Sequence, residues 1–278
     1  MFNMLTNKKI SFIGAGTIAE SLISGLLKGK LVDPELIWIT NNRNAERLQK
    51  IQKKYDVNVT YDRKVLLSNA NIVILAMKPK NFTKAMEEIK PYTYENQLFL
   101  SLVSVISSVF VSKLLGHKAP IIRACPNTPA AIGESATGLA PGNYVKNRDI
   151  LIATYLFDAI GSVTTVTEKE IDAVTALAGS APAYIFYLIE AMEKAGEALG
   201  LEKEVSKQLV VQSLIGSTHL IKSSSEETST LYKQVMSPQG VTEAGFEILK
   251  QYKFQESIIE GIKRGTERSR EIGEILSK

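Results

Sequence analysis

Two glycines near the start of the chain separate a strand pattern from a helix pattern. Residues 10–13 are mostly apolar, as in a buried strand, and helical spacing of apolar residues resumes over 22–27. Glycines at such a turn let the main chain approach a phosphate, and the unpaired N–H groups that begin the helix attract its negative charge. The pattern therefore predicts a dinucleotide-binding turn that contains Ile13, Gly14, Ala15, Gly16, Thr17 and Ile18.

The first half of the chain alternates strand-like and helix-like segments. Continuous apolar runs at 72–76 and 98–103 are typical of parallel strands covered on both faces. This alternation predicts a doubly wound, Rossmann-type α/β domain over 1–166, with ligands at the carboxyl ends of its strands. We expect strands at 10–13, 36–40, 72–76, 98–103, 120–124, 136–139 and 162–166, and further helices at 44–55, 82–89 and 108–115.

Helical periodicity dominates from Thr167 to the end, which predicts an all-α domain over 167–278. Gly200 is expected to end one helix, and Thr228 is a plausible N-cap. The uncharged stretch 173–189 approaches the length of a membrane span, but Gly179, Ser180 and Pro182 favour two helices buried in a core or a subunit interface. The helices are expected at 168–178, 181–199, 203–223, 228–236, 242–252 and 254–276.

Composition is that of an ordinary globular enzyme. The chain has 278 residues and a net charge of only +4 with scattered basic residues, so no nucleic-acid partner is indicated. One cysteine, Cys125, excludes internal disulfides and suits the reducing cytoplasm, and no apolar targeting segment precedes the first strand. His117 and His219 are far apart without ligand-like spacing, so no metal site is expected.

The segment Thr40-Asn41-Asn42-Arg43 should set the choice between NADP and NAD. An NAD site usually has a carboxylate after the second strand to accept from the ribose 2′-hydroxyl. Here the chain offers amides and an arginine, which suits a 2′-phosphate. We therefore expect NADPH rather than NADH, with Asn42 and Arg43 as ligands. Arg43 could alternatively cap a surface turn.

Two loops after predicted elements are further candidates. Ala76, Met77, Lys78 and Pro79 end the central strand, where the cofactor should lie, although Lys-Pro after a strand also makes an ordinary turn.

The second loop is the Ser-Pro-x-Gly-x-Thr turn at 237–242. Free N–H groups at Val241 and Thr242, together with the dipole of the helix that begins there, would bind a carboxylate. The alternative is a plain helix–helix turn with Thr242 as the N-cap.

Five segments match one known family in order. They are Ile13-Gly14-Ala15-Gly16 with Ala19-Glu20, Ala76-Met77-Lys78-Pro79, Arg123-Ala124-Cys125-Pro126-Asn127-Thr128-Pro129 with Gly133 and Thr137-Gly138, Ala176-Leu177-Ala178-Gly179-Ser180-Ala181-Pro182-Ala183-Tyr184, and Ser237-Pro238-Gln239-Gly240-Val241-Thr242. On these motifs the chain resembles pyrroline-5-carboxylate reductase over nearly its full length.

The resemblance implies reduction of 1-pyrroline-5-carboxylate to L-proline with NADPH, the last step of proline biosynthesis. It also implies dimers built through the helical domain, often arranged as a ring, with each active site shared between two subunits. Residues 13–18 and 76–79 would hold the cofactor. The turn with Ser237, Gly240, Val241 and Thr242 would hold the substrate carboxylate, and the Thr242 hydroxyl would lie near the ring nitrogen and supply or relay a proton.

Several residues depart from the family pattern. Val105 replaces a glycine, which suggests either crowding on the nicotinamide side or a different path of the loop. Met236 replaces a small residue, and Gln239 replaces the first glycine of its turn. Arg63 stands where an asparagine near the adenosine is common, and Cys125, expected to be a buried core residue, stands where methionine is common. Two alternatives follow: an NADPH-dependent reductase of another cyclic imine, and a catalytically silent nucleotide-binding sensor.

Overall fold

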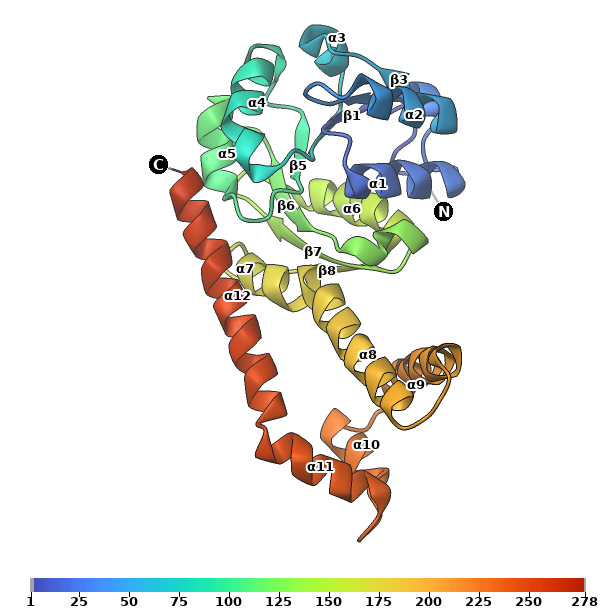
Figure 1. The fold of residues 1–278 in the computed structure, drawn as a ribbon. Helices are drawn as coiled ribbons and strands as arrows, with labels where there is room; N and C mark the ends of the chain where they lie inside the picture. Colours follow the sequence, from blue (N-terminus) through green and yellow to red (C-terminus); the bar gives the residue numbers. More distant parts are fainter. Residues whose placement is uncertain (1–2, 278) are drawn as a thin grey trace. The chain divides into compact units, whose positions relative to one another are not determined.

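The computed structural model describes residues 3–277 and divides into two compact units (Figure 1). One unit holds the described residues up to Pro182 together with those from Lys263 onward, and the other is Ala183–Ile262. The long helices α8 (Ala181–Ala198) and α12 (Phe254–Leu276) each run through both units. The domain boundary expected at 166/167 stays a prediction.

The first unit is built on one eight-stranded sheet with the order β3-β2-β1-β4-β5-β6-β7-β8. All neighbouring strands are parallel except β6 and β7. This is the doubly wound α/β architecture that the sequence predicts. The strands are β1 Ile10–Ile13, β2 Ile37–Thr40, β3 Asn58–Val59, β4 Ile72–Leu75, β5 Leu98–Ser101, β6 Ile121–Cys125, β7 Ser135–Pro141 and β8 Gly161–Thr165.

The strand order reverses between β1 and β4. Chain order runs outward from β1 to β2 and β3 on one side, and from β4 to β5 and β6 on the other. Ile13 pairs with both Thr40 and Leu75, so the carboxyl ends of β2, β1 and β4 are level with one another. A reversal of this kind leaves a crevice at those ends, which is where doubly wound sheets bind ligands.

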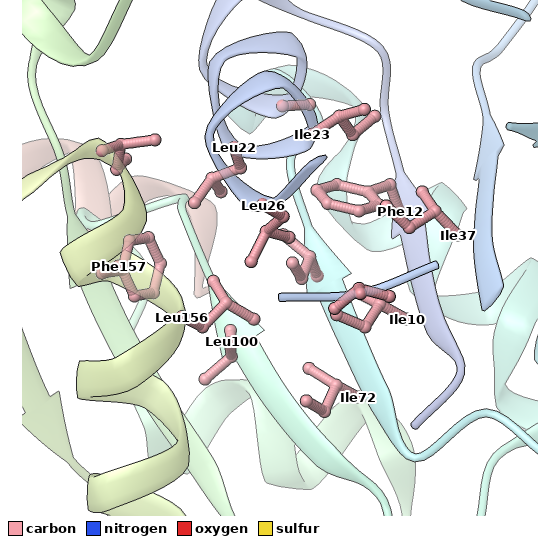
Figure 2. Close-up of a cluster of buried hydrophobic side chains, with 14 of the residues drawn as sticks. Ile10, Phe12, Leu22, Ile23, Leu26, Ile37, Ile72, Leu100, Leu156 and Phe157 are labelled. Carbon is pink, nitrogen blue, oxygen red and sulfur yellow. The ribbon is translucent and has the colours of Figure 1, made fainter. Parts of the chain in front are cut away.

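Two apolar clusters cover the two faces of the sheet. Ile10 and Phe12 of β1 pack with α1 (Thr17–Lys28) and α6 (Asn147–Phe157) on one face, as Figure 2 shows for Leu22, Leu26 and Phe157. Alternate strand residues, among them Ile13, Val73 and Phe99, face the other cluster, with α4 (Phe82–Ile89) and α5 (Ser108–Leu115). Complete burial of a side chain of this size contributes about 1.5–3 kcal/mol, so these faces fix the strand register.

Helices of the first unit begin close to the expected positions, but three elements were missed. Strand β3 has two residues and helix α3 has five, too few to show a period. Helix α6 was missed although its buried residues Ile152, Ala153, Leu156 and Phe157 have helical spacing. The helices are α1 Thr17–Lys28, α2 Ala45–Tyr55, α3 Arg63–Leu67, α4 Phe82–Ile89, α5 Ser108–Leu115, α6 Asn147–Phe157 and α7 Ile171–Val174.

The expected helix start at Ala181 is confirmed, but no gap separates this helix from the one before it. Residues 171–198 form one helical run, in which α7 passes through a π-helical turn, Thr175–Gly179, into α8. The N–H of Ser180 donates to the Thr175 carbonyl at 3.0 Å, the i→i−5 bond of a π turn. Pro182, which has no N–H, sits in the first turn of α8 without breaking the run.

The second unit consists of helices. The bounds of α9 and α12 are those the sequence predicts, and Gly200 after α8 adopts a left-handed φ of +93° as expected. Thr228 is not an N-cap, since Glu227 holds that position and Thr228 begins the helix. The remaining helices are α9 Lys203–Ser223, α10 Thr228–Gln234 and α11 Val241–Gln251.

Candidate functional site

Gly14 lies where the turn after β1 comes closest to the end of β4. Its φ is +122°, which favours glycine, and a Cβ there would lie 2.3 Å from the Ala76 carbonyl oxygen. The Gly14 N–H donates to the Thr40 carbonyl at 2.9 Å, and the Ala76 N–H donates to the Ile13 carbonyl at 2.9 Å. The turn is thus joined to the ends of β2 and β4, and it requires glycine at position 14.

Gly16 caps helix α1 and leaves open space beside it. Its backbone is extended, and no side chain accepts a hydrogen bond from the first turn of the helix. A Cβ at Gly16 would meet nothing within 4 Å. Because the first N–H groups of a helix lack partners within it, this open end fits a phosphate group.

This space belongs to a cavity of about 240 Å³ at the carboxyl ends of β1, β2 and β4. Most of the predicted cofactor residues line it. They are Ile13, Gly14, Ala15, Gly16, Asn42, Ala76, Met77 and Lys78.

The other four predicted cofactor residues are near the cavity in sequence but do not line it. Thr17 and Ile18 form the first turn of α1, and Pro79 begins the 3-10 turn Pro79–Asn81. Arg43 is exposed in the loop before α2. Their roles stay predictions.

Further residues complete the cavity, and the sequence suggested no role for those from the segment 81–88. Asn81, Lys84, Ala85 and Glu88 have i, i+3, i+4, i+7 spacing, so one face of the segment that becomes α4 forms a wall. That spacing, directly after Lys78-Pro79, was a usable signal. Thr40 and Asn41, from the segment expected to set the choice of cofactor, and Arg63 also line the cavity.

Charge in the cavity favours a polyanion. Its lining carries three cations, Arg63, Lys78 and Lys84, and one anion, Glu88. Arg63 pairs with Glu88 at 3.0 Å and donates from Nη1 to the Thr40 hydroxyl at 2.6 Å. The cavity therefore combines an open helix N-terminus with an excess of positive charge, as a dinucleotide requires.

Arg47 of α2 contacts the turn at 13–16 but does not line the cavity. Its Nε donates to the Ala15 carbonyl at 2.9 Å, and its Nη2 pairs with Glu20 at 2.5 Å. Lys54 and Tyr55 also donate to Glu20, at 2.9 and 3.1 Å. Partial burial alone would raise the pKa of Glu20, but these hydrogen bonds outweigh it and hold the pKa below its usual value.

The turn at 237–242 lies in the second unit and begins helix α11. Gly240 is the N-cap, so the alternative of Thr242 as N-cap was wrong. Its N–H donates to the Ser237 carbonyl at 2.9 Å, and a Cβ there would lie 2.3 Å from Ser237 Oγ. No side chain caps the first turn, and Val241 is 94% exposed. The N–H groups of Val241 and Thr242 are therefore available to an anion.

One family departure, Gln239, lies in this turn, and aromatic rings pack nearby. Gln239 has a φ of +56°, a value that favours glycine, and its N–H donates to the Glu243 carboxylate at 2.6 Å. Phe246 stacks on Tyr232 with ring centres 5.5 Å apart. Both rings line a cavity of about 260 Å³ that also includes Thr242.

Side chains of the segment 123–129 contact residues between 168 and 178. Arg123 is buried and pairs with Glu168 at 3.0 Å and Asp172 at 3.7 Å. Asn127 donates from Nδ2 to the Ala178 carbonyl at 3.1 Å. Cys125 is buried, as predicted, and burial raises the pKa of its thiol.

Val105 does not line the dinucleotide cavity. It lines a separate cavity of about 320 Å³ with Arg123 and Arg270. A Cβ on Gly273 of α12 would lie 2.4 Å from the Val105 carbonyl oxygen, so α12 packs closely against the loop after β5.

One described helical run, Ile171–Ala198, is long and apolar enough to cross a membrane by length and composition alone. In the single chain its α8 portion is not buried in a core, since Ile185, Phe186 and Tyr187 are largely exposed. An exposed apolar face of this kind is also what an interface between subunits requires.

Two family profiles match the chain. Residues 168–272 match the pyrroline-5-carboxylate reductase dimerisation domain, which accounts for the exposed apolar face by self-association. Residues 9–105 match the domain described as coenzyme F420-dependent NADP oxidoreductase.

Similar proteins cover nearly the whole chain. Pyrroline-5-carboxylate reductase 2 of Bacillus subtilis is 41% identical over 96% of each chain. A solved pyrroline-5-carboxylate reductase from Coxiella burnetii has a TM-score of 0.86 at 32% identity and covers 95% of this chain and 98% of its own. The Plasmodium falciparum pyrroline carboxylate reductase, solved with NADP bound, has a TM-score of 0.86 at 26% identity and covers 96% and 98%. The chain thus belongs to the pyrroline-5-carboxylate reductase family.

Proposed function

We propose that this protein reduces 1-pyrroline-5-carboxylate to L-proline with NADPH, the last step of proline biosynthesis. The observation that carries the proposal is the cavity at Gly14–Gly16, in which an uncapped helix N-terminus meets three cationic side chains. Membership of the family supports a nicotinamide cofactor and this substrate.

Residues of the first unit bind the cofactor in this proposal. NADPH, when bound, supplies a hydride to C5 of the ring. Gly16, Thr17 and Ile18 hold its diphosphate with main-chain N–H groups. Residues 76–79 lie at the end of the adjacent strand β4 and orient the nicotinamide half, and Asn42 and Arg43 stay candidates for the 2′-phosphate.

Residues of the second unit bind the substrate. The N–H groups of Val241 and Thr242 hold the carboxylate, while Ser237 and Gly240 fix the turn that presents them. The Thr242 hydroxyl supplies or relays the proton that the ring nitrogen gains. A protonated imine needs little further activation, so orientation of the ring contributes more than acid catalysis.

Self-association completes the proposed site. The chain dimerises through its helical domain, and each active site forms between the nucleotide domain of one subunit and the helical domain of its partner. Exposed apolar residues of α8 support this arrangement. We propose a dimer or a ring of dimers in the cytoplasm.

Initial rates of NADPH oxidation test this function. We expect 1-pyrroline-5-carboxylate to give a higher kcat/KM with NADPH than with NADH, and a higher value than a six-membered cyclic imino acid. Preference for the larger ring would favour the alternative reductase. Tight NADPH binding without turnover of either ring would identify a sensor and refute the proposal.

A further inference from the structure

Arg63 stands next to the position that distinguishes NADP from NAD. Thr40 is the last residue of β2, and the residues that follow this strand contact the ribose 2′ group in doubly wound dinucleotide sites. Nη1 of Arg63 donates to Thr40 Oγ1 at 2.6 Å, and the guanidinium lines the cavity. By contrast, Arg43 is exposed and is not part of the lining.

The pairing of Arg63 with Glu88 leaves much of the guanidinium unused. Nε and Nη2 both donate to the same oxygen, Oε2 of Glu88, at 3.3 and 3.0 Å. This is weaker than a fork in which two nitrogens meet two oxygens. One hydrogen on Nη1 and one on Nη2 stay available, and a phosphate could offer three oxygens to them.

Glu88 is the only anion among the described residues that line the cavity, and a lysine on its own helix lies near it in sequence. Lys84 lies one turn earlier on the same face of α4 and also lines the cavity. Residues at i and i+4 on a helix are neighbours, so Glu88 can pair with Lys84 when Arg63 is taken by another anion.

We propose that Arg63 recognises the 2′-phosphate of the cofactor, and that the phosphate displaces Glu88 from it. NADH brings no anion to this place, so Arg63 stays paired with Glu88 and contributes nothing to its binding. Glu88 thus sets how strongly the site discriminates between the cofactors. This inference rests on the proposed use of NADPH.

Binding of two adenosine fragments to the full-length protein tests the inference without turnover. The probes are 2′,5′-ADP, which carries the 2′-phosphate, and 5′-AMP, which lacks it, both measured by titration calorimetry. Arg63→Gln should weaken 2′,5′-ADP binding about tenfold or more while 5′-AMP changes less than about twofold. Glu88→Gln should strengthen 2′,5′-ADP binding several-fold.

Matched controls are available on the same two helices. Lys64 and Glu87 adjoin the two residues in sequence, are exposed, and do not line the cavity. Lys64→Gln and Glu87→Gln remove the same charges and should leave the ratio of the two affinities unchanged. Arg43→Gln tests the competing candidate for the 2′-phosphate, and it should change the ratio much less than Arg63→Gln.

The role of Arg63 and the exchange at Glu88 can each be refuted by a different result. Equal losses of both probes in Arg63→Gln, or a larger loss in Arg43→Gln, would overturn the role of Arg63. Unchanged or weaker 2′,5′-ADP binding in Glu88→Gln would overturn the exchange. If Arg63→Gln does not fold, Arg63→Lys should keep only part of the preference, and full retention would count against the inference.

Different results would refute the preference for NADPH and the role of Arg63. Wild-type protein that binds 2′,5′-ADP no better than 5′-AMP would refute the NADPH preference and the inference with it. Wild-type preference that persists in Arg63→Gln would refute the inference alone.

Discussion

Replacing Arg47 with glutamine removes the support behind the dinucleotide turn without touching the cavity. The variant loses the hydrogen bond to the Ala15 carbonyl and the pair with Glu20. A hydrogen bond to a charged group contributes about 1.5–3 kcal/mol, and the 31% exposure of the Arg47 side chain lowers this to about 1–2 kcal/mol. If that energy holds the turn in its binding conformation, the Kd for NADP should rise about 5- to 30-fold.

Titration calorimetry with NADP measures this change, and Lys50→Gln is the control. Lys50 lies on the same helix and pairs with Glu46 at 2.9 Å on the exposed surface. The control should bind as wild type does. Arg47→Gln should raise KM for NADPH and keep kcat within about twofold of wild type. The reason is that Arg47 supports cofactor binding and makes no interaction specific to the transition state. A folded Arg47→Gln protein with the control's Kd would refute this reasoning.

Other substitutions separate stability from binding. Gly14→Ala should lose about 2–4 kcal/mol in urea unfolding because of its positive φ and the Ala76 carbonyl. Gly16→Ala should keep its stability within about 1 kcal/mol, since its Cβ meets nothing, but should bind NADP more weakly. Wild-type stability in the first or wild-type binding in the second would contradict the phosphate-turn geometry. Thr242→Ala should slow turnover of 1-pyrroline-5-carboxylate without abolishing it, and unchanged kinetics would remove Thr242 from the mechanism. Because burial raises the pKa of Cys125, its thiol should react far more slowly with a thiol reagent in native than in urea-unfolded protein at pH 8. Equal rates would contradict its burial.

Long periodic elements were predictable from the sequence. Helix α12 has enough turns to show a period, and the apolar runs of β4 and β5 have the length and the β-branched composition of buried strands. Helix α3 and strand β3 were not predictable, because a few residues carry no period and depend on tertiary packing.

The candidate site was predictable only where its residues are close in sequence. The turn at 13–16 contains its own glycine signal, and Pro79 directly follows the segment 76–78. Arg63 and Glu88 come from separate helices, so their pairing and the hydrogen bond from Arg63 to Thr40 depend on the fold. In the π turn at 175–179 the Ala178 carbonyl accepts a hydrogen bond from Asn127, a contact that the local sequence does not show.

The most direct test of the proposed reaction follows the transferred hydrogen. Protein incubated with 1-pyrroline-5-carboxylate and NADPH dideuterated at C4 of the nicotinamide should yield L-proline with one deuterium at C5, detected by mass spectrometry and NMR. Proline without deuterium, or oxidation of NADPH without proline, would contradict the account.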